Sequence, residues 1–256
     1  MNQSGTHKLA LFVEGQTEQI FVEKLIRFLG KGASVAIQVE RMKGSKRPND
    51  HIEGFITPVD EKRARVGWIS AAHPPGGGDW WMRFAYPPYG PYDRLISEGF
   101  HHIIGIRDVY PHHRKDIDQI RKGFQFGLRT DPIAPALILA IMEIEAWLLS
   151  EYSHFPRIHP GLTPQRIRQA FGFDPAADDM RLRDHPAKDL EAIYFLETIT
   201  YDKSRQAAER TINNLDFSRI RDEVAARFGD LRRLVELIRT FFDYPRRSSN
   251  EPLPQS

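Results

Sequence analysis

The chain has 256 residues, with 36 Lys and Arg against 34 Asp and Glu, and it contains no cysteine. The length fits one α/β domain with an appendage or two domains, and the balanced charge excludes a protein that attracts polyanions over its whole surface. The lack of cysteine excludes disulfides and cysteine-ligated zinc or iron–sulfur centres, so any metal site is built from carboxylates, His and water.

The N-terminal residues MNQSGTHK lack the basic-then-apolar order of a signal peptide. The longest apolar run, Ala134–Met142, is interrupted by Pro135 and is too short to span a bilayer. We therefore expect a soluble, cytoplasmic protein with no membrane partner.

The first predicted elements are a strand, a turn and a helix. Lys8–Val13 is a short apolar run with β-branched and aromatic members, which is typical of a buried strand. Thr17 is placed to cap the helix that follows, in which apolar residues recur at helical spacing from Ile20 until Gly30 ends it.

The next stretch combines short strands with polar and aromatic segments. The pattern predicts strands at 34–39 and 63–70 and a polar loop at 43–50. Residues 71–92 are rich in Gly, Pro and aromatic residues, and we interpret them as an insertion. Its aromatic rings suit either stacking on unpaired bases or packing against a partner or the sheet.

Helices and strands then alternate. We expect helices at 92–98, 116–128 and 142–152, and strands at 102–108 and 136–141. Such alternation predicts an α/β fold in which a mostly parallel sheet is flanked by helices on both faces.

The sequence suggests three regions. Residues 1–155 carry the α/β pattern and form the expected catalytic domain. Residues 156–245 show helical patterns, for example at 204–215 and 217–242, and predict a helical C-terminal region. Residues 246–256 form a polar tail that we expect to be disordered.

Acidic residues follow three of the predicted strands. Glu14 ends the first, Asp108 ends the strand at 102–108, and Glu143 and Glu145 follow the strand at 136–141. The carboxyl ends of parallel strands meet at one edge of a sheet, where ligands bind. Each acid alone could merely cap a helix, but converging carboxylates need a shared cation, and oxygen ligands favour Mg²⁺ or Mn²⁺.

Three stretches carry a resemblance. LFVEGQTEQIFVEKL resembles the first motif of the TOPRIM domain, the metal-binding fold of primases, type II topoisomerases and OLD-family nucleases, in its nuclease version acid-Gly-x-Thr/Ser-Glu. IIGIRDVYP resembles the second TOPRIM motif. LILAIMEIEAWLLSE resembles a segment of bacterial TOPRIM-like proteins of unknown or phage-defence function, commonly encoded beside an SMC-like ATPase. The resemblance covers roughly the first 150 residues.

The resemblance implies that Glu14 is a metal ligand or general base and that Asp108 is a metal ligand. Many TOPRIM domains have Asp-x-Asp in the second motif, whereas this chain has Asp108-Val109-Tyr110, which puts a phenol in place of the second carboxylate. The bacterial branch resembles this sequence in its Asp-x-Tyr.

Other acids are candidates for the missing ligand. Glu143 or Glu145 can supply the oxygen that Tyr110 does not, and Glu18 lies about one helical turn beyond Glu14. We therefore expect a Mg²⁺ or Mn²⁺ site made from the acids Glu14, Glu18, Asp108, Glu143 and Glu145.

Further candidates lie outside the strand ends. DHPAKDL with Lys188 and TYDKSRQ with Lys203 and Arg205 resemble the Pro-x-Lys and Tyr-x-Lys segments that follow the catalytic core in this bacterial family. The resemblance implies catalytic roles for the two lysines and substrate binding by Arg205. His112, close after Asp108, is a further candidate for substrate binding. The alternative is that these are ordinary solvated side chains.

The resemblance implies a Mg²⁺-dependent nuclease that hydrolyses DNA or RNA phosphodiesters as the effector of a bacterial anti-phage system, with an SMC-like or ABC-type ATPase as partner. The alternative is a catalytically degenerate TOPRIM module that binds an ATPase partner or nucleic acid without cleaving.

Overall fold

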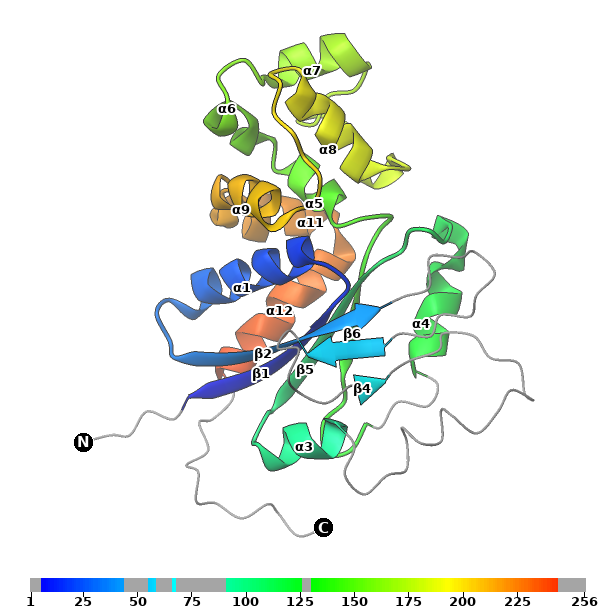
Figure 1. The fold of residues 1–256 in the computed structure, drawn as a ribbon, viewed down its shortest axis with the longest axis vertical. Coiled ribbons are helices and arrows are strands. Elements are labelled where there is room, and N and C mark those ends of the chain that lie inside the picture. The colour runs from blue at the N-terminus through cyan, green and yellow to red at the C-terminus, as the bar shows by residue number, and fades with distance from the viewer. Residues whose placement is uncertain (1–5, 44–54, 59–65, 68–90, 126–129, 244–256) are drawn as a thin grey trace.

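The computed structural model describes residues 6–43, 55–58, 66–67, 91–125 and 130–243 (Figure 1). Four sequence predictions lie wholly or mainly outside these residues: the polar loop at 43–50, the strand at 63–70, the insertion at 71–92 and the tail at 246–256.

A six-stranded sheet with the order β4-β3-β2-β1-β5-β6 forms the centre of the fold. Strands β1, β2, β5 and β6 run parallel, while β3 and β4 add an antiparallel edge beside β2. The strands are β1 His7–Val13, β2 Val35–Lys43, β3 Phe55–Pro58, β4 Val66–Gly67, β5 His102–Asp108 and β6 Ala136–Ala140. The predicted α/β class and mostly parallel sheet are confirmed.

Helices cover both faces of the sheet. On one face, Leu9 and Leu11 of β1 belong to the same buried core as α1 (Gln16–Gly30) and α12 (Gly229–Asp243). On the other face, Ala10 packs with α3 (Pro91–Ser97) and Leu137 of β6 packs with α4 (Ile117–Gln125). Because both faces are buried, the strands read as continuous apolar runs.

The connections reverse direction at β1. Helix α1 leads from β1 to its neighbour β2, whereas the chain after β2 returns past β1 to form β5 on its other side (Figure 1). In open α/β sheets, ligands bind outside the carboxyl ends of the strands where the strand order reverses. The ends of β1 and β5 are therefore the expected location of a site.

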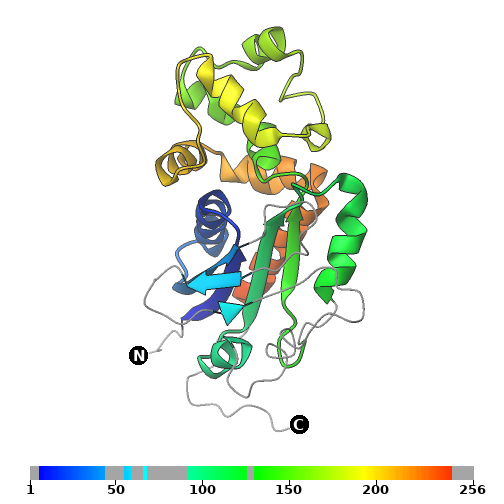
Figure 2. The same ribbon diagram turned by 45° about the vertical axis from the view of Figure 1, so that its right-hand side comes forward.

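The C-terminal region is helical, as predicted, and helices α6, α7 and α8 lie beyond the end of the sheet (Figures 1 and 2). No helix in the described part of the chain combines the length and apolarity needed to cross a bilayer. The remaining helices are α5 Glu145–Ser150, α6 Phe155–Ile158, α7 Pro164–Phe171, α8 Pro186–Phe195, α9 Arg205–Asn213, α10 Phe217–Arg219 and α11 Ala225–Arg227. Short 3-10 turns are η1 Arg114–Asp116, η2 Tyr152–His154 and η3 Met180–Leu182, and η4 Ile220–Val224 is a π turn.

One apolar core runs from β1 through α5 and α8 to α12. Helix α12 returns to the face of the sheet, so part of the C-terminal region completes the core of the N-terminal part (Figure 1). The division into domains at 1–155 and 156–245 stays a prediction.

Two predicted helix starts are wrong. Gly15, not Thr17, precedes the first helical residue, and Thr17 lies buried in the first turn, where it interacts with Tyr201. The helix predicted from Met142 begins only at Glu145. Met142 adopts a left-handed backbone with φ of 60°, which forms a turn after β6 instead.

Two other boundaries also differ. Strand β2 extends to Lys43 because it pairs with β1 from Val35 to Arg41 and with the short antiparallel β3 from Glu40 to Lys43. The sequence did not predict β3. The helix predicted at 217–242 is divided at Phe228, whose backbone is extended and whose side chain is buried. Burial of Phe228 in the core outweighs the continuous helical pattern around it.

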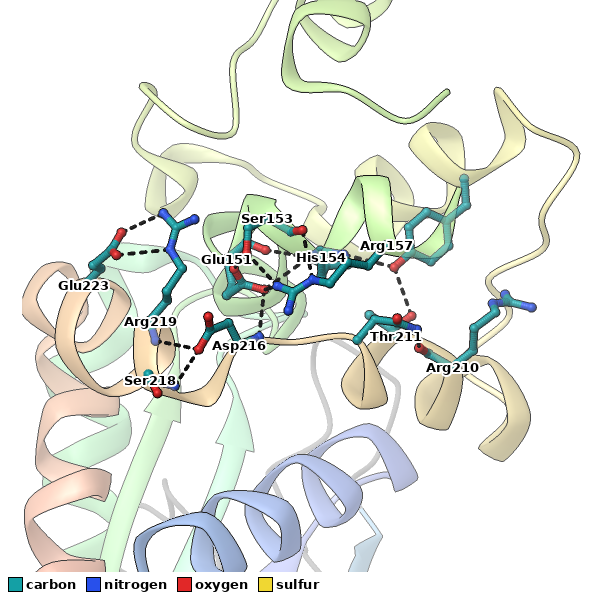
Figure 3. Close-up of polar contacts among 12 residues, drawn as sticks. Glu151, Ser153, His154, Arg157, Arg210, Thr211, Asp216, Ser218, Arg219 and Glu223 are labelled. Atoms are coloured by element: carbon teal, nitrogen blue, oxygen red, sulfur yellow. Dashed lines mark hydrogen bonds and ion pairs between the residues drawn. The ribbon is translucent and has the colours of Figure 1, made fainter. Parts of the chain in front are cut away.

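A buried polar network connects the helices beyond the sheet (Figure 3). The carboxylate of Glu151 accepts hydrogen bonds from the Ser153 hydroxyl and from the Asp216 N–H at 3.2 Å, and it pairs with Arg157 at 3.3 Å. The ring of His154, fully buried, lies 2.6 Å from the Glu151 carbonyl oxygen and 3.0 Å from the hydroxyl of Tyr194 on α8.

The network continues to α9, because the Tyr194 hydroxyl donates to Thr211 at 3.1 Å. Burial lowers the pKa of His154 to about 4, so its ring is neutral at physiological pH. The network therefore holds α8 and α9 in place without a buried positive charge on His154. Both helices begin beside the carboxylates described below.

We expect Glu151→Ala to lower the free energy of unfolding by roughly 2–4 kcal/mol, because it leaves a buried N–H and a hydroxyl without their acceptor. Denaturant unfolding followed by circular dichroism measures the change. Glu223→Ala is the matched control, because Glu223 is 53% exposed and its pair with Arg219 is worth about 0–1 kcal/mol. Equal losses in the two variants would contradict a structural role for Glu151.

Candidate metal centre

The ends of β1 and β5 bring Glu14 and Asp108 together. Val13, the last residue of β1, is paired with Ile106, and β5 continues for two more residues to Asp108, which pairs with Ala140 of β6. The carboxylate of Glu14 accepts a hydrogen bond from the Asp108 N–H at 3.2 Å and lies 3.4 Å from the guanidinium of Arg107. The two acids therefore meet at the point where the strand order reverses.

Asp108, Glu143 and Glu145 form a buried acidic triad whose ligand oxygens all lie within 4.8 Å of one another. Each carboxylate is held by a neighbouring group. Asp108 accepts from the Ile144 N–H at 2.9 Å, Glu143 from the Ala187 N–H at 2.9 Å and Glu145 from the Tyr201 hydroxyl at 2.8 Å. This spacing can hold one metal ion.

Glu18 brings a further carboxylate from the first turn of α1. It is buried, and its Oε2 atom has no hydrogen-bond partner among the described residues. A Cβ atom on Gly15 would lie 2.8 Å from that oxygen, so the absence of a side chain at Gly15 makes room for the carboxylate. A buried carboxylate oxygen without a partner is costly, and a bound cation removes that cost.

Lys203 faces the acids from the chain between α8 and α9. Its Nζ atom lies 3.1 Å from Glu143 Oε1 and 3.3 Å from Glu145 Oε2. Burial alone would lower the pKa of Lys203, but the carboxylates of Glu145, Asp108 and Glu143 outweigh burial and raise it. Its backbone is left-handed with φ of 57°, a conformation that is unfavourable outside glycine and occurs at functional sites.

The carboxylates hinder one another's ionisation. Burial raises the pKa of Asp108 well above its usual range, and repulsion from Glu18 and Glu145 adds to this effect. Burial likewise raises the pKa of Glu18 to about 7, with a contribution from Glu145. Burial also raises the pKa of Glu14 and of Glu145. Full ionisation therefore leaves an excess of negative charge.

The residues fit a hard divalent cation. The available ligands are carboxylate oxygens, which suit Mg²⁺, Mn²⁺ or Ca²⁺ better than softer metals. The excess negative charge and the unpartnered Glu18 oxygen are both compensated by such an ion. The acidic cluster, which we define as Glu14, Glu18, Asp108, Glu143 and Glu145, is thus the set that the sequence predicted.

Among the described residues, three other predicted site residues form no hydrogen bond or ion pair with the acidic cluster: Lys188, Arg205 and His112. Lys188 is exposed on the first turn of α8, next to Ala187, and forms no ion pair with a described carboxylate. Arg205 is 64% exposed and pairs with Glu209 along its own helix at 2.8 Å. His112 lies on the turn after β5, where burial and then the charge of Arg107 lower its pKa.

Two contacting residues were not predicted. Tyr201 holds Glu145 through its hydroxyl, and Arg107 pairs with Glu14. The signal for Arg107 was a charged residue inside an otherwise apolar strand. Tyr201 stands only two residues before Lys203, in the segment TYDKSRQ that was singled out for its lysine.

Comparisons with protein-family models, curated proteins and solved structures find no match to this chain.

Proposed function

We propose that this protein is a Mg²⁺- or Mn²⁺-dependent nuclease that hydrolyses phosphodiester bonds of DNA or RNA. The observation that carries the proposal is the convergence of five carboxylates from the ends of three neighbouring strands and the first turn of α1. Among the described residues the buried Oε2 atom of Glu18 has no hydrogen-bond partner, and Lys203 lies beside the carboxylates. Carboxylate clusters of this kind position divalent ions for phosphoryl chemistry.

Asp108, Glu143 and Glu145 would hold the ion, with Glu18 as a further ligand. When bound, a divalent ion stabilises negative charge on phosphate oxygens and lowers the pKa of coordinated water. The ammonium group of Lys203, 42% exposed, can orient a phosphate and offset its charge.

Glu14 suits the role of proton acceptor. Its side chain is 26% exposed, so water reaches it, and the Asp108 N–H and Arg107 fix its orientation. Burial raises its pKa above the usual range of a glutamate, which makes its carboxylate a stronger proton acceptor.

The wider setting rests on the resemblance of three stretches to TOPRIM proteins. On that basis we propose a TOPRIM-like domain acting as the effector of a bacterial anti-phage system, with an SMC-like or ABC-type ATPase partner. The exposed Tyr110 leaves the Asp-x-Asp position without its second carboxylate. The acids Glu18, Glu143 and Glu145 gather at the same site in its place.

The test is a cleavage assay on single-stranded and duplex DNA and RNA with Mg²⁺ or Mn²⁺ titrated. We expect metal-dependent cleavage that Glu14→Ala lowers by at least about 10²-fold, the usual effect of losing a general base. Glu98→Ala is the control, because Glu98 is 47% exposed and lies at the end of α3.

Metal-dependent binding of nucleic acid or ATPase without cleavage, under every condition and with the partner present, would contradict the nuclease. That result would support the catalytically degenerate binding module instead.

A further inference from the structure

Tyr110 and His185 form an exposed aromatic corner beside the acidic cluster. Tyr110 follows Asp108 by two residues and is 45% exposed. Its ring lies 5.4 Å from the ring of His185, and the two planes meet at 80°. His185 is itself exposed, directly before α8, whose Ala187 N–H donates to Glu143. Tyr110 is therefore two residues from Asp108, and His185 is two residues from the N–H that binds Glu143.

The corner is held rigid from both sides. The Tyr110 N–H donates to the carbonyl of Met142, the residue before Glu143, at 2.8 Å. Arg114 joins the turn after β5 to the segment before His185. It donates to the carbonyls of Arg181 and Arg183 at 2.9 and 2.6 Å and pairs with Asp184 at 2.6 Å.

Both views of the fold place the turn before α4 close to η3 and the start of α8 (Figures 1 and 2). The two rings are thus fixed relative to each other, although they are far apart in the sequence. Fixed aromatic rings bind flat ligands with little loss of side-chain freedom.

We propose that the Tyr110–His185 corner stacks an unpaired base of a single-stranded nucleic acid next to the scissile phosphate. The inference rests on the proposed nuclease and names its substrate class. Two rings at nearly a right angle let a base lie flat against one while its edge meets the other. A base face is free for such contact only in single strands, since duplex bases are already stacked.

The position favours nucleic acid over a protein partner. The corner lies beside the acids that would hold the ion, and Lys203 provides an exposed positive charge at the same cluster. Tyr110 is two residues from Asp108, and the Ala187 N–H two residues after His185 binds Glu143, so a strand whose phosphate reaches this cluster passes beside the two rings. Tyr110 is therefore a substrate-contacting residue, not a failed metal ligand.

The experiment measures binding of fluorescein-labelled oligonucleotides of about 12 nucleotides by anisotropy, with Ca²⁺ in place of Mg²⁺. The single strand and the matching duplex are compared as DNA and as RNA. We expect Tyr110→Ala to weaken single-strand binding about 10-fold, Tyr110→Phe to bind like the native protein, and duplex binding to stay unchanged. His185→Ala weakens single-strand binding in the same direction by less.

Phe195→Ala is the matched control, because Phe195 is 72% exposed at the opposite end of α8 and is expected to have no effect. Quenching of a single 2-aminopurine by the native protein and its loss in Tyr110→Ala report stacking directly. Thermal melting confirms that each variant is folded.

Equal losses on single strand and duplex, no loss in Tyr110→Ala, or no single-strand binding by the native protein would each overturn the inference. The two proposals fail separately. If the native protein cleaves and Tyr110→Ala binds normally, the aromatic corner is wrong and the nuclease stands. If single strands bind through Tyr110 but no condition gives cleavage, the nuclease is wrong and the binding site stands.

Discussion

Asp108→Asn is expected to lower metal-dependent cleavage on the order of 10³-fold while leaving the fold intact. An ion that stabilises the transition state is worth several kcal/mol, and each 1.36 kcal/mol corresponds to about tenfold in rate. Asp108 lies at the centre of the cluster, because it belongs to the acidic triad and its backbone N–H also holds Glu14.

Asp108→Asn removes the negative charge of the side chain while keeping the local structure. The Oδ1 atom of Asp108 accepts from the Ile144 N–H at 2.9 Å, and the carbonyl oxygen of Asn can accept the same hydrogen bond. The start of α5 is therefore preserved while the negative charge is lost. Cleavage assays measure the reaction rate, and calorimetric titration measures the affinity for Mn²⁺. We expect the rate and the affinity to fall together in Asp108→Asn.

Asp230→Asn is the matched control for Asp108→Asn. Asp230 is also buried, but it lies at the start of α12, pairs with Arg121 of α4 at 2.6 Å and does not belong to the acidic cluster. We expect Asp230→Asn to change stability and leave the cleavage rate per folded molecule unchanged. A normal rate in Asp108→Asn would exclude the acidic cluster as the catalytic centre.

The position of the acids could be predicted from the sequence because parallel sheets have a fixed geometry. Glu14 and Asp108 each follow an apolar run, and strands with two buried faces place their following residues at one edge. The pairing of Val13 with Ile106 then brings the two acids together. Local pattern and sheet geometry point to the same place, so this prediction needed only the apolar runs and the expectation of a parallel sheet.

The remaining parts of the site depend on tertiary contacts that periodicity does not encode. Glu143 lies in a turn because Met142 adopts a left-handed backbone, whereas the apolar pattern predicted a helix there. Tyr201 reaches Glu145 across 56 positions of sequence, a pairing that no spacing rule contains. Arg205, chosen beside Lys203, points instead along α9 to Glu209.

Boundary errors have the same origin. Thr17 has the side chain of a helix cap, but its burial against Tyr201 places it inside the first turn. Capping preferences are worth about 1 kcal/mol, and burial of neighbouring side chains exceeds that. The same competition breaks the helical pattern at Phe228.

Glu18→Gln is expected to stabilise the metal-free protein above pH 7 while weakening its affinity for Mn²⁺. Burial, with the charge of Glu145, raises the pKa of Glu18 from 4.5 to about 7 in the folded state. Between these values the folded protein holds a proton that the unfolded chain has released. The free energy of unfolding therefore falls as pH rises from about 4.5 to 7.

The size of the fall follows from the pKa difference. At 1.36 kcal/mol per pKa unit, ionised Glu18 destabilises the metal-free fold by at most roughly 3 kcal/mol above pH 7. Gln is neutral and has nearly the same shape as Glu. The free energy of unfolding of the variant therefore lacks the pH-dependent decrease that Glu18 causes. The variant and the native protein are expected to converge below pH 4.5, where Glu18 is protonated in both the folded and unfolded states.

With metal bound, we expect the native protein to be more stable than the Glu18→Gln variant. An ion that binds only the folded state stabilises it by RT ln(1 + [L]/Kd), and the native protein with its full set of carboxylates gains more than the variant. Denaturant unfolding at pH 5 and pH 8, with EDTA or with Mn²⁺, measures all four cases. Glu23→Gln on the same helix, where Glu23 accepts a hydrogen bond from Gln19 at 2.9 Å, is the control and should leave the pH dependence unchanged.

A Glu18→Gln variant less stable than the native protein at pH 8 in EDTA would mean that the carboxylate already has a compensating partner. The unpartnered Oε2 atom of Glu18 would then carry no information about a cation. The opposite result ties the instability of the empty acidic cluster to its affinity for metal. The same buried charge that costs stability without an ion is then the source of binding energy when one is present.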